Sequence, residues 1–190
     1  MDAIEALRTR QSARALKEPA PAGAALEALL ECAVRAPDHG RLRPWRFILI
    51  ESAQRAAFGE LLADQARRSK AGSTPESLER EKQKAFRAPL IIVVAAVPSA
   101  SVKIPQIEQV LSAAAAAQNL MVAAYASGFN AMWKTGDAAY DEHVKHALGL
   151  EPKDSIVGFM YVGTDAGEPS TLPRPSWREH TSVWDGARAS

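Results

Sequence analysis

Apolar positions along the chain follow two patterns, short continuous runs and a helical repeat, which predict where strands and helices lie. Residues 89–97 (PLIIVVAAV) form an unbroken apolar run, which is typical of a strand covered on both faces. Residues 44–51 (PWRFILIE) are rich in β-branched and aromatic side chains and also predict a strand. Two further strands are predicted within residues 129–135 (FNAMWKT) and 155–164 (SIVGFMYVGT).

Helical spacing predicts a long helix over residues 105–128, which open with proline and close with glycine. Its many alanines allow other backbones to approach closely, so we expect a central helix that packs against a second copy of the chain. The positions that follow its helical repeat are Ile107, Val110, Leu111, Ala114, Leu120, Met121 and Ala124. Shorter helices are expected within residues 2–9 (Ile4 and Leu7 facing inward), 24–36, 52–68, 75–86 and 140–148.

Interleaved strands and helices with long crossovers favour a mixed sheet flanked by helices, in one domain over residues 1–190. From Gly167 onward the chain is rich in proline and lacks periodicity, which predicts an extended tail over residues 167–190. Trp177 and Trp184 lie in this tail. Large aromatic side chains need a surface to pack on, so we expect the tail to contact a partner subunit.

Composition narrows the function classes. The net charge is +1 and the isoelectric point about 7.9, so no strong field would attract nucleic acid or a membrane surface. Cys32 is the single cysteine, so no disulfide within the chain can form, and its helical position predicts a buried, inert thiol. With no apolar signal core and no membrane span predicted, we expect a cytoplasmic protein.

An arginine-rich segment, residues 8–14 (RTRQSAR), holds Arg8, Arg10, Arg14 and Ser12 within seven positions. Guanidinium groups suit phosphate because each donates two parallel hydrogen bonds, and a serine hydroxyl adds a donor. The alternative is a solvated helix end, where arginines are favoured in any case. Composition alone leaves both open.

Two other segments combine stiff backbone with polar or aromatic side chains. Residues 35–45 (RAPDHGRLRPW) form a loop of the kind that covers ligands, in which His39 is either an acid–base residue or a structural one. In residues 127–136 (SGFNAMWKTG), Trp133 and Lys134 could flank a planar anionic ring, or be a packed indole and a surface cation.

Common catalytic and metal motifs are missing from the sequence. His143 and His146 lie one helical turn apart, but no third ligand follows at a usual spacing, so a solvated helix face is favoured over zinc. The sequence has no G-x-S-x-G, G-x-G-x-x-G or P-loop motif. No metal is therefore expected.

Taken in order, the three segments resemble the FMN-dependent nitroreductase family, closest to a compact bacterial branch. The motifs are residues 10–14 (RQSAR), residues 35–39 (RAPDH) leading to residues 43–45 (RPW), and Gly128 leading to residues 133–135 (WKT). The similarity runs from residue 1 to about residue 163. It implies an α+β fold with a mainly antiparallel sheet, and a homodimer with FMN at the interface.

The resemblance also implies a set of site residues, some of which reach a flavin from the opposite subunit. FMN would contact Arg10, Gln11, Ser12, Arg35, His39, Trp133, Lys134 and Thr135, and NADH or NADPH would lie near Ala123, Ala124, Tyr125, Ala126, Ser127 and Gly128. Two departures from the family pattern stand in these segments, and both keep donor capacity. Gln11 replaces an arginine, which removes one permanent charge, and Lys134 replaces the arginine of close relatives, which exchanges a bidentate guanidinium for a point charge.

The implied activity is oxidoreduction, with hydride passing from NAD(P)H through FMN to nitroaromatics, quinones or similar planar acceptors in a ping-pong cycle. The flavin carries the chemistry, so no catalytic side chain is expected, although Lys134 is a candidate for tuning its potential. The alternative is a flavin- or nucleotide-binding protein on the same fold without nitroreductase activity.

Overall fold

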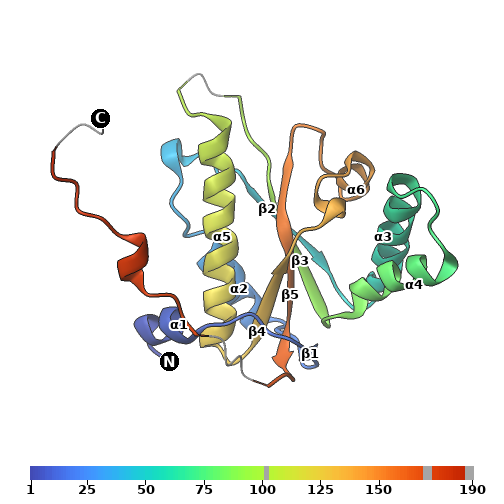
Figure 1. Cartoon of the computed structure of the whole chain (residues 1–190), viewed down its shortest axis with the longest axis horizontal. Coiled ribbons are helices and arrows are strands. Elements are labelled where there is room, and N and C mark those ends of the chain that lie inside the picture. The colour runs from blue at the N-terminus through green and yellow to red at the C-terminus, as the bar shows by residue number, and fades with distance from the viewer. Residues whose placement is uncertain (101–102, 169–172, 187–190) are drawn as a thin grey trace.

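The computed structural model describes residues 1–100, 103–168 and 173–186 and has a five-stranded sheet at its centre (Figure 1). The strands are β1 (Leu16–Lys17), β2 (Trp45–Ile50), β3 (Leu90–Ala96), β4 (Asn130–Lys134) and β5 (Ser155–Asp165). β3 pairs with β2 and β5, and β5 pairs also with β4 and β1, all antiparallel. The four strands expected from the sequence are confirmed.

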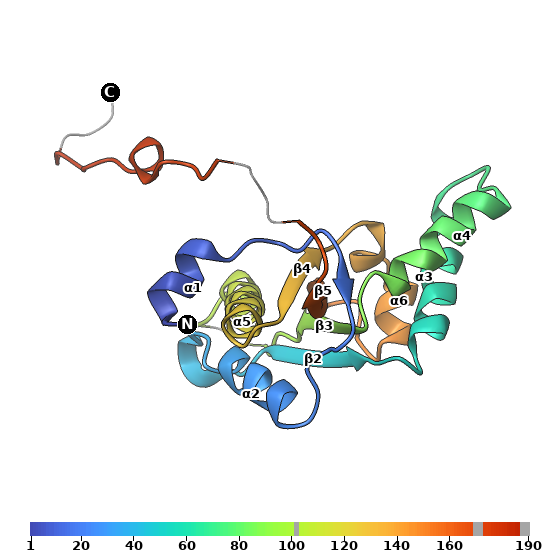
Figure 2. The ribbon, with the colours of Figure 1, turned by 90° about the horizontal axis from the view of Figure 1, so that it is seen from below.

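Two layers of helices cover the sheet (Figure 2). One face carries α1 (Ala3–Thr9), α2 (Ala24–Ala33) and α5 (Gln106–Ala126), and the other carries α3 (Arg55–Ser69), α4 (Pro75–Gln83) and α6 (Glu142–Ala147). Short 3-10 helices are η1 (His39–Arg41), η2 (Lys84–Phe86), η3 (Asp137–Ala139) and η4 (Trp177–His180). This arrangement confirms the α+β class with a sheet flanked by helices.

The buried strand β3 separates two hydrophobic cores, as its unbroken apolar run predicts. Successive side chains point to opposite faces of a strand. Ile91 and Val93 therefore join the core beneath α3 and α6, whereas Ile92 and Val94 join the core beneath α5. All seven residues of β3 are buried.

Large apolar side chains of α5 and α1 do not face inward as predicted. Ile107 and Leu111 are 61% and 59% exposed, and Ile4 and Leu7 are also exposed. Half of the buried residues of α5 are alanines, whose small side chains let the helix lie close to the sheet, and the others are Gln109, Ser112, Leu120 and Met121. Of the positions in the predicted repeat, Leu120, Met121 and Ala124 are buried, whereas Ile107 and Leu111 are exposed.

Cys32 is also exposed, which corrects the prediction of a buried thiol. It lies on α2, whose contact with the core is made by Leu29 and Ala33. Within the described residues, no helix is both long and apolar enough to cross a bilayer.

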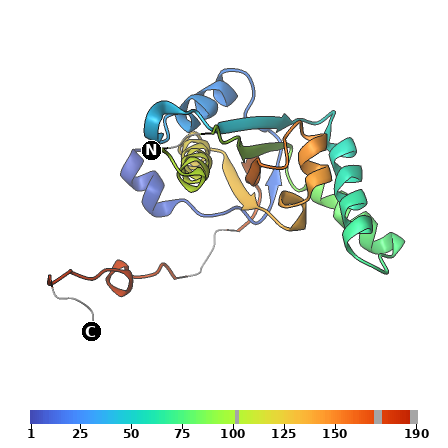
Figure 3. The same ribbon diagram turned by 90° about the horizontal axis from the view of Figure 1, so that it is seen from above.

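The described part of the tail, residues 173–186, leads away from the body of the chain (Figures 2 and 3). Trp177, Val183 and Trp184 are all exposed in it. Residues 169–172 and 187–190, which belong to the predicted tail, lie outside the described residues. Packing of the tail on a partner subunit stays a prediction.

Candidate functional site

The arginine-rich segment lies beside β4, next to one end of the strand. The backbone N–H of Ala13 donates to the carbonyl of Ala131 at 3.1 Å, which places Ala13 beside the start of this strand. The five residues of β4 then span about 13 Å at 3.3 Å per residue. Lys134 and Thr135 follow at the far end, so two of the three predicted segments share one edge of the sheet.

Arg10 supplies an unsatisfied buried donor at the near end of this edge. Its Nη1 is buried and has no hydrogen-bond partner among the described residues. Burial lowers the pKa of Arg10, the charge of Arg174 lowers it further, and Tyr125 raises it. A buried donor without a partner is costly, and an anion at this point would satisfy it.

Arg174 is a second cation at the same place, and sequence analysis missed it. Its Nη2 donates to the carbonyls of Thr9 and Arg10, at 3.1 and 2.9 Å. These carbonyls belong to the C-terminal end of α1, where cations are favoured. Because Arg174 stands in the proline-rich tail, far along the chain from Arg10, no local pattern could have connected the two.

The last turn of α5 lies near the arginines. Tyr125 is close enough to influence the pKa of Arg10, and the turn ends at Gly128, whose φ of +85° suits glycine. The predicted nicotinamide-binding residues Ala123, Ala124, Tyr125, Ala126, Ser127 and Gly128 therefore lie at the Arg10 end of the edge. Ala124 is buried, whereas Ser127 and Gly128 are exposed.

The side chain of Trp133 is partly buried and packs against the core. Its Nε1 donates to the carbonyl of Val157 at 3.1 Å, and its ring lies so close to Gly158 that an added Cβ would be 2.2 Å from Nε1. The indole is therefore packed against β5, and a contact of Trp133 with a flavin stays a prediction. Lys134 and Thr135, by contrast, are exposed and line a cavity of about 150 Å³.

Arg35 and His39 lie at a different place along α5. The Nδ1 of His39 is 2.7 Å from a carboxylate oxygen of Glu108 in the first turn of α5, whereas Arg10 lies near Tyr125 in the last turn. With a rise of 1.5 Å per residue, these positions are about 25 Å apart along the helix. Figure 1 shows α1 beside the C-terminal end of α5. One chain therefore does not bring His39 to Arg10. Arg35 follows the C-terminal end of α2, where the carbonyl of Cys32 accepts from Asn119 of α5.

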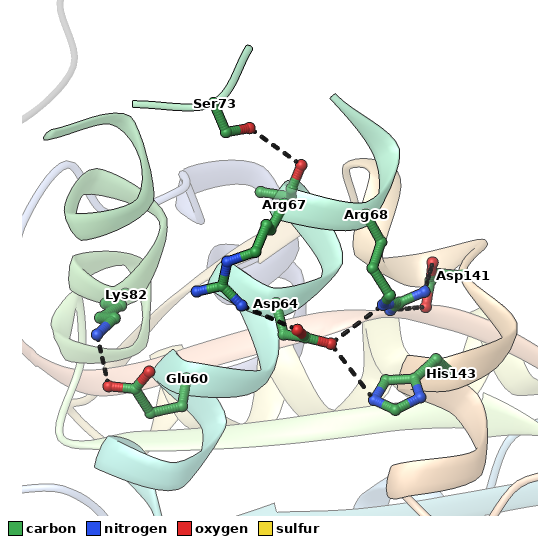
Figure 4. Close-up of polar contacts among 9 residues, drawn as sticks. Glu60, Asp64, Arg67, Arg68, Ser73, Lys82, Asp141 and His143 are labelled. Carbon is green, nitrogen blue, oxygen red and sulfur yellow. Dashed lines mark hydrogen bonds and ion pairs between the residues drawn. The ribbon is translucent and has the colours of Figure 1, made fainter. Parts of the chain in front are cut away.

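A polar network joins α3 to α6 behind the cavity (Figure 4). Arg68 donates to Asp64 at 3.0 Å and to Asp141 at 2.9 Å, and Asp141 also caps α6 by accepting from the N–H of Val144. Burial alone would raise the pKa of Asp141, but the bonds from Arg68 and Val144 together hold it below its ordinary value. The network fixes α3 against α6.

His143 belongs to this network, with its Nε2 3.6 Å from a carboxylate oxygen of Asp64 (Figure 4). Lys82 of α4 pairs with Glu60 of α3 at 2.7 Å, which joins the two helices. In the part of the chain that the structure describes, no three His, Cys, Asp or Glu side chains are grouped as metal ligands.

Comparison with known proteins agrees with this arrangement. The sequence profile of the nitroreductase family matches residues 7–164. The chain is 40% identical over 179 residues to an Escherichia coli (strain K12) protein named "Putative NAD(P)H nitroreductase YdjA", covering 93% of this chain and 97% of that protein.

Two solved structures share the fold. The nitroreductase-like family protein from Bacillus cereus has a TM-score of 0.82 at 22% identity, covering 98% of this chain and 97% of that one. The FMN and NADPH-dependent nitroreductase NfnB from Sphigopyxis sp. strain HMH has a TM-score of 0.77 at 18% identity, covering 97% and 99%. The family profile matches most of this chain, which shows that the chain belongs to the nitroreductase family.

Proposed function

We propose that this protein is an FMN-dependent oxidoreductase, which passes hydride from NADH or NADPH to nitroaromatics, quinones or similar planar acceptors in a ping-pong cycle. The observation that carries the proposal is the buried, unpartnered Nη1 of Arg10 beside the guanidinium of Arg174. Membership of the nitroreductase family supports it, as do the names of the two similar enzymes, which mention NAD(P)H and FMN.

Bound FMN would supply the acceptance and donation of hydride, so the chain itself has to bind and orient it. Arg10 and Ser12, with Arg174, would hold the phosphate, and Gln11 would reach the ribityl chain or the ring edge. Thr135 and the backbone of Trp133 would border the ring at the far end of β4. Lys134 would place a positive charge near the ring, where it favours the negative charge gained on reduction.

The nicotinamide donor would lie near the last turn of α5, residues 123–128. The carbonyls at this helix end carry partial negative charge. Contact with the uncharged nicotinamide or ribose is therefore favoured here over contact with a phosphate group.

The site would be completed in a homodimer. Because His39 lies about 25 Å from Arg10 along α5, a second copy would have to bring it to the flavin, together with Arg35 from the same loop. The exposed Ile107 and Leu111 of α5 give an apolar surface for that copy. The tail, with its exposed tryptophans, would pack on the partner subunit.

The colour of the purified protein and its reduction by NADH or NADPH test the proposed function. The purified chain should be yellow, and NADH or NADPH should bleach it without oxygen, with a nitroaromatic or quinone restoring the colour. Arg10→Ala should lose most of the bound FMN. A colourless protein that ignores added FMN would refute the proposal, whereas a yellow protein that neither nucleotide bleaches would be a flavin-binding protein without this activity.

Mixing of variants tests the shared site. Arg10→Ala and His39→Ala should each bind FMN weakly alone. In a mixed dimer, one of the two sites regains both residues, so FMN binding should recover to about half of the parent's capacity. No recovery after the subunits have exchanged would show that both residues serve one chain or that His39 has no part in the site.

A further inference from the structure

The cavity beyond β4 is not explained by flavin binding alone. It lies between the end of β4, the α3–α4 pair and β5, on the side of Lys134 and Thr135. Its lining residues are Leu62, Gln65, Lys70, Glu81, Lys84, Arg87, Lys134, Thr135, Gly136, Asp137, Ala138, Phe159 and Tyr161. It is therefore next to the proposed position of the flavin ring and remote from the phosphate end at Arg10.

The volume of this cavity limits what it can hold. At about 150 Å³ it is comparable to an engineered protein cavity that binds benzene. Sites for whole drug-sized ligands and cofactors are usually roughly 300–1,000 Å³. A single substituted aromatic ring is the size that matches, and a dinucleotide or a flavin is too large.

The charges around the cavity are unbalanced. Its two carboxylates, Glu81 and Asp137, are already shared with lysines: Lys84 pairs with Glu81, and Lys70 lies 4.0 Å from Glu81 and 3.3 Å from Asp137. Neither Arg87 nor Lys134 has an acidic partner within ion-pair distance among residues 1–100, 103–168 and 173–186. Two cations are thus left to face an anion.

The walls of the cavity suit an aromatic ring. Phe159 and Leu62 are buried apolar side chains that line it. Tyr161, also buried, has its pKa raised to about 12 by burial, so its hydroxyl is neutral at physiological pH and adds no negative charge. The combination is an apolar wall with a cationic rim, which an aromatic acid would complement.

We propose that this cavity is the acceptor subsite and that it binds the carboxylate-bearing ring of a small aromatic acid, with Arg87 and Lys134 facing the carboxylate. The proposal rests on the proposed function and narrows its substrate class to anionic aromatic acceptors. The planar guanidinium of Arg87 can donate two parallel hydrogen bonds to a carboxylate, which the point charge of a lysine cannot.

The test compares an acid with a neutral molecule of the same shape. The FMN-loaded protein is assayed with 4-nitrobenzoate and 4-nitrobenzamide under saturating NADPH or NADH, and binding of benzoate and benzamide is measured by calorimetry. The acid should be preferred by about tenfold in both measurements, and the preference should fall with added salt. Arg87→Gln should remove the preference for the acid over the amide.

Arg80→Gln is the matched control, because Arg80 is exposed on α4 and does not line the cavity. It should keep the preference for the acid. Equal use of acid and amide by the parent, or an unchanged preference in Arg87→Gln, would overturn the inference while the enzyme activity stands. Loss of bound flavin in Arg87→Gln would also overturn it, by assigning the cavity to the cofactor.

If the protein binds no FMN, the proposed function fails, and calorimetry with benzoate and benzamide on the protein as purified still decides whether the cavity selects an acid. Equal or absent binding of the two would overturn the inference in that case as well.

Discussion

Replacement of Arg174 by glutamine should weaken FMN binding by removing one of the two cations proposed for its phosphate. In the chain alone, Arg174 donates to the carbonyls of Thr9 and Arg10, and its charge lowers the pKa of Arg10. Without Arg174 that repulsion disappears, so Arg10 keeps its charge more firmly. Any loss of affinity would therefore come from the missing contact itself.

The expected size follows from the kind of bond that is lost. A hydrogen bond between charged groups contributes about 1.5–3 kcal/mol, which corresponds to a rise in the Kd for FMN of roughly ten- to a hundredfold. Glutamine keeps donor capacity, so the lower part of this range is expected. The measurement is a titration of the flavin-free protein, followed by quenching of FMN fluorescence.

Riboflavin, which lacks the phosphate, separates a phosphate contact from a general loss of structure. Arg174→Gln should change the Kd for FMN and leave that for riboflavin nearly unchanged. Arg178→Gln is the control within the same tail, because Arg178 stacks on Trp177 with 4.7 Å between the guanidinium carbon and the ring centroid. A parent-like Kd for FMN in Arg174→Gln, or an equal loss for riboflavin, would refute the phosphate assignment.

Three further changes test other parts of the site. Gly158→Ala should lower the free energy of unfolding, measured by urea titration, by roughly 2–4 kcal/mol. The added Cβ would displace the ring of Trp133 and break the hydrogen bond of its indole. An unchanged urea midpoint would contradict this packing. Lys134→Met should lower the reduction potential of bound FMN by about 30 mV in redox titration, since about 1.4 kcal/mol of stabilisation of the reduced form is lost. An unaltered potential would remove Lys134 from this role. The pKa of Asp141 is depressed in the folded chain, so this carboxylate stabilises the fold fully above the ordinary pKa of 3.8, and the stabilisation is lost as the pH falls below that value. Asp141→Asn should therefore flatten the dependence of the urea midpoint on pH between about 5 and 3. An equally steep dependence would count against the pairing of Asp141 with Arg68.

Local features of the sequence were enough to predict most of the elements. The apolar run of residues 89–97 specified a strand covered on both faces, because such a run has no polar side to present to water. Proline at residue 105 and glycine at residue 128 marked the ends of α5, since each depends on the backbone of a few neighbouring residues. These signals act within one element and need no partner from elsewhere in the chain.

The faces that elements bury were decided by tertiary packing. The helical repeat of α5 includes Ile107 and Leu111, which are exposed, as well as Leu120 and Met121, which are buried together with alanines that let the helix lie close to the sheet. A helical repeat shows that apolar residues share a face, and it does not show whether this chain or another molecule covers that face.

The candidate site was predicted only in part, because tertiary packing also decides which residues far apart in the sequence come together. The sequence by itself determined which short segments carry donors for a phosphate and a ring, since these residues are neighbours in the chain. Only the tertiary structure placed Arg174 against Arg10, separated His39 from them along α5, and gathered the cations of the cavity from the end of α3, from η2 and the residue after it, and from the end of β4. Distances between residues far apart in sequence depend on how the helices pack on the sheet, and no local pattern records that packing.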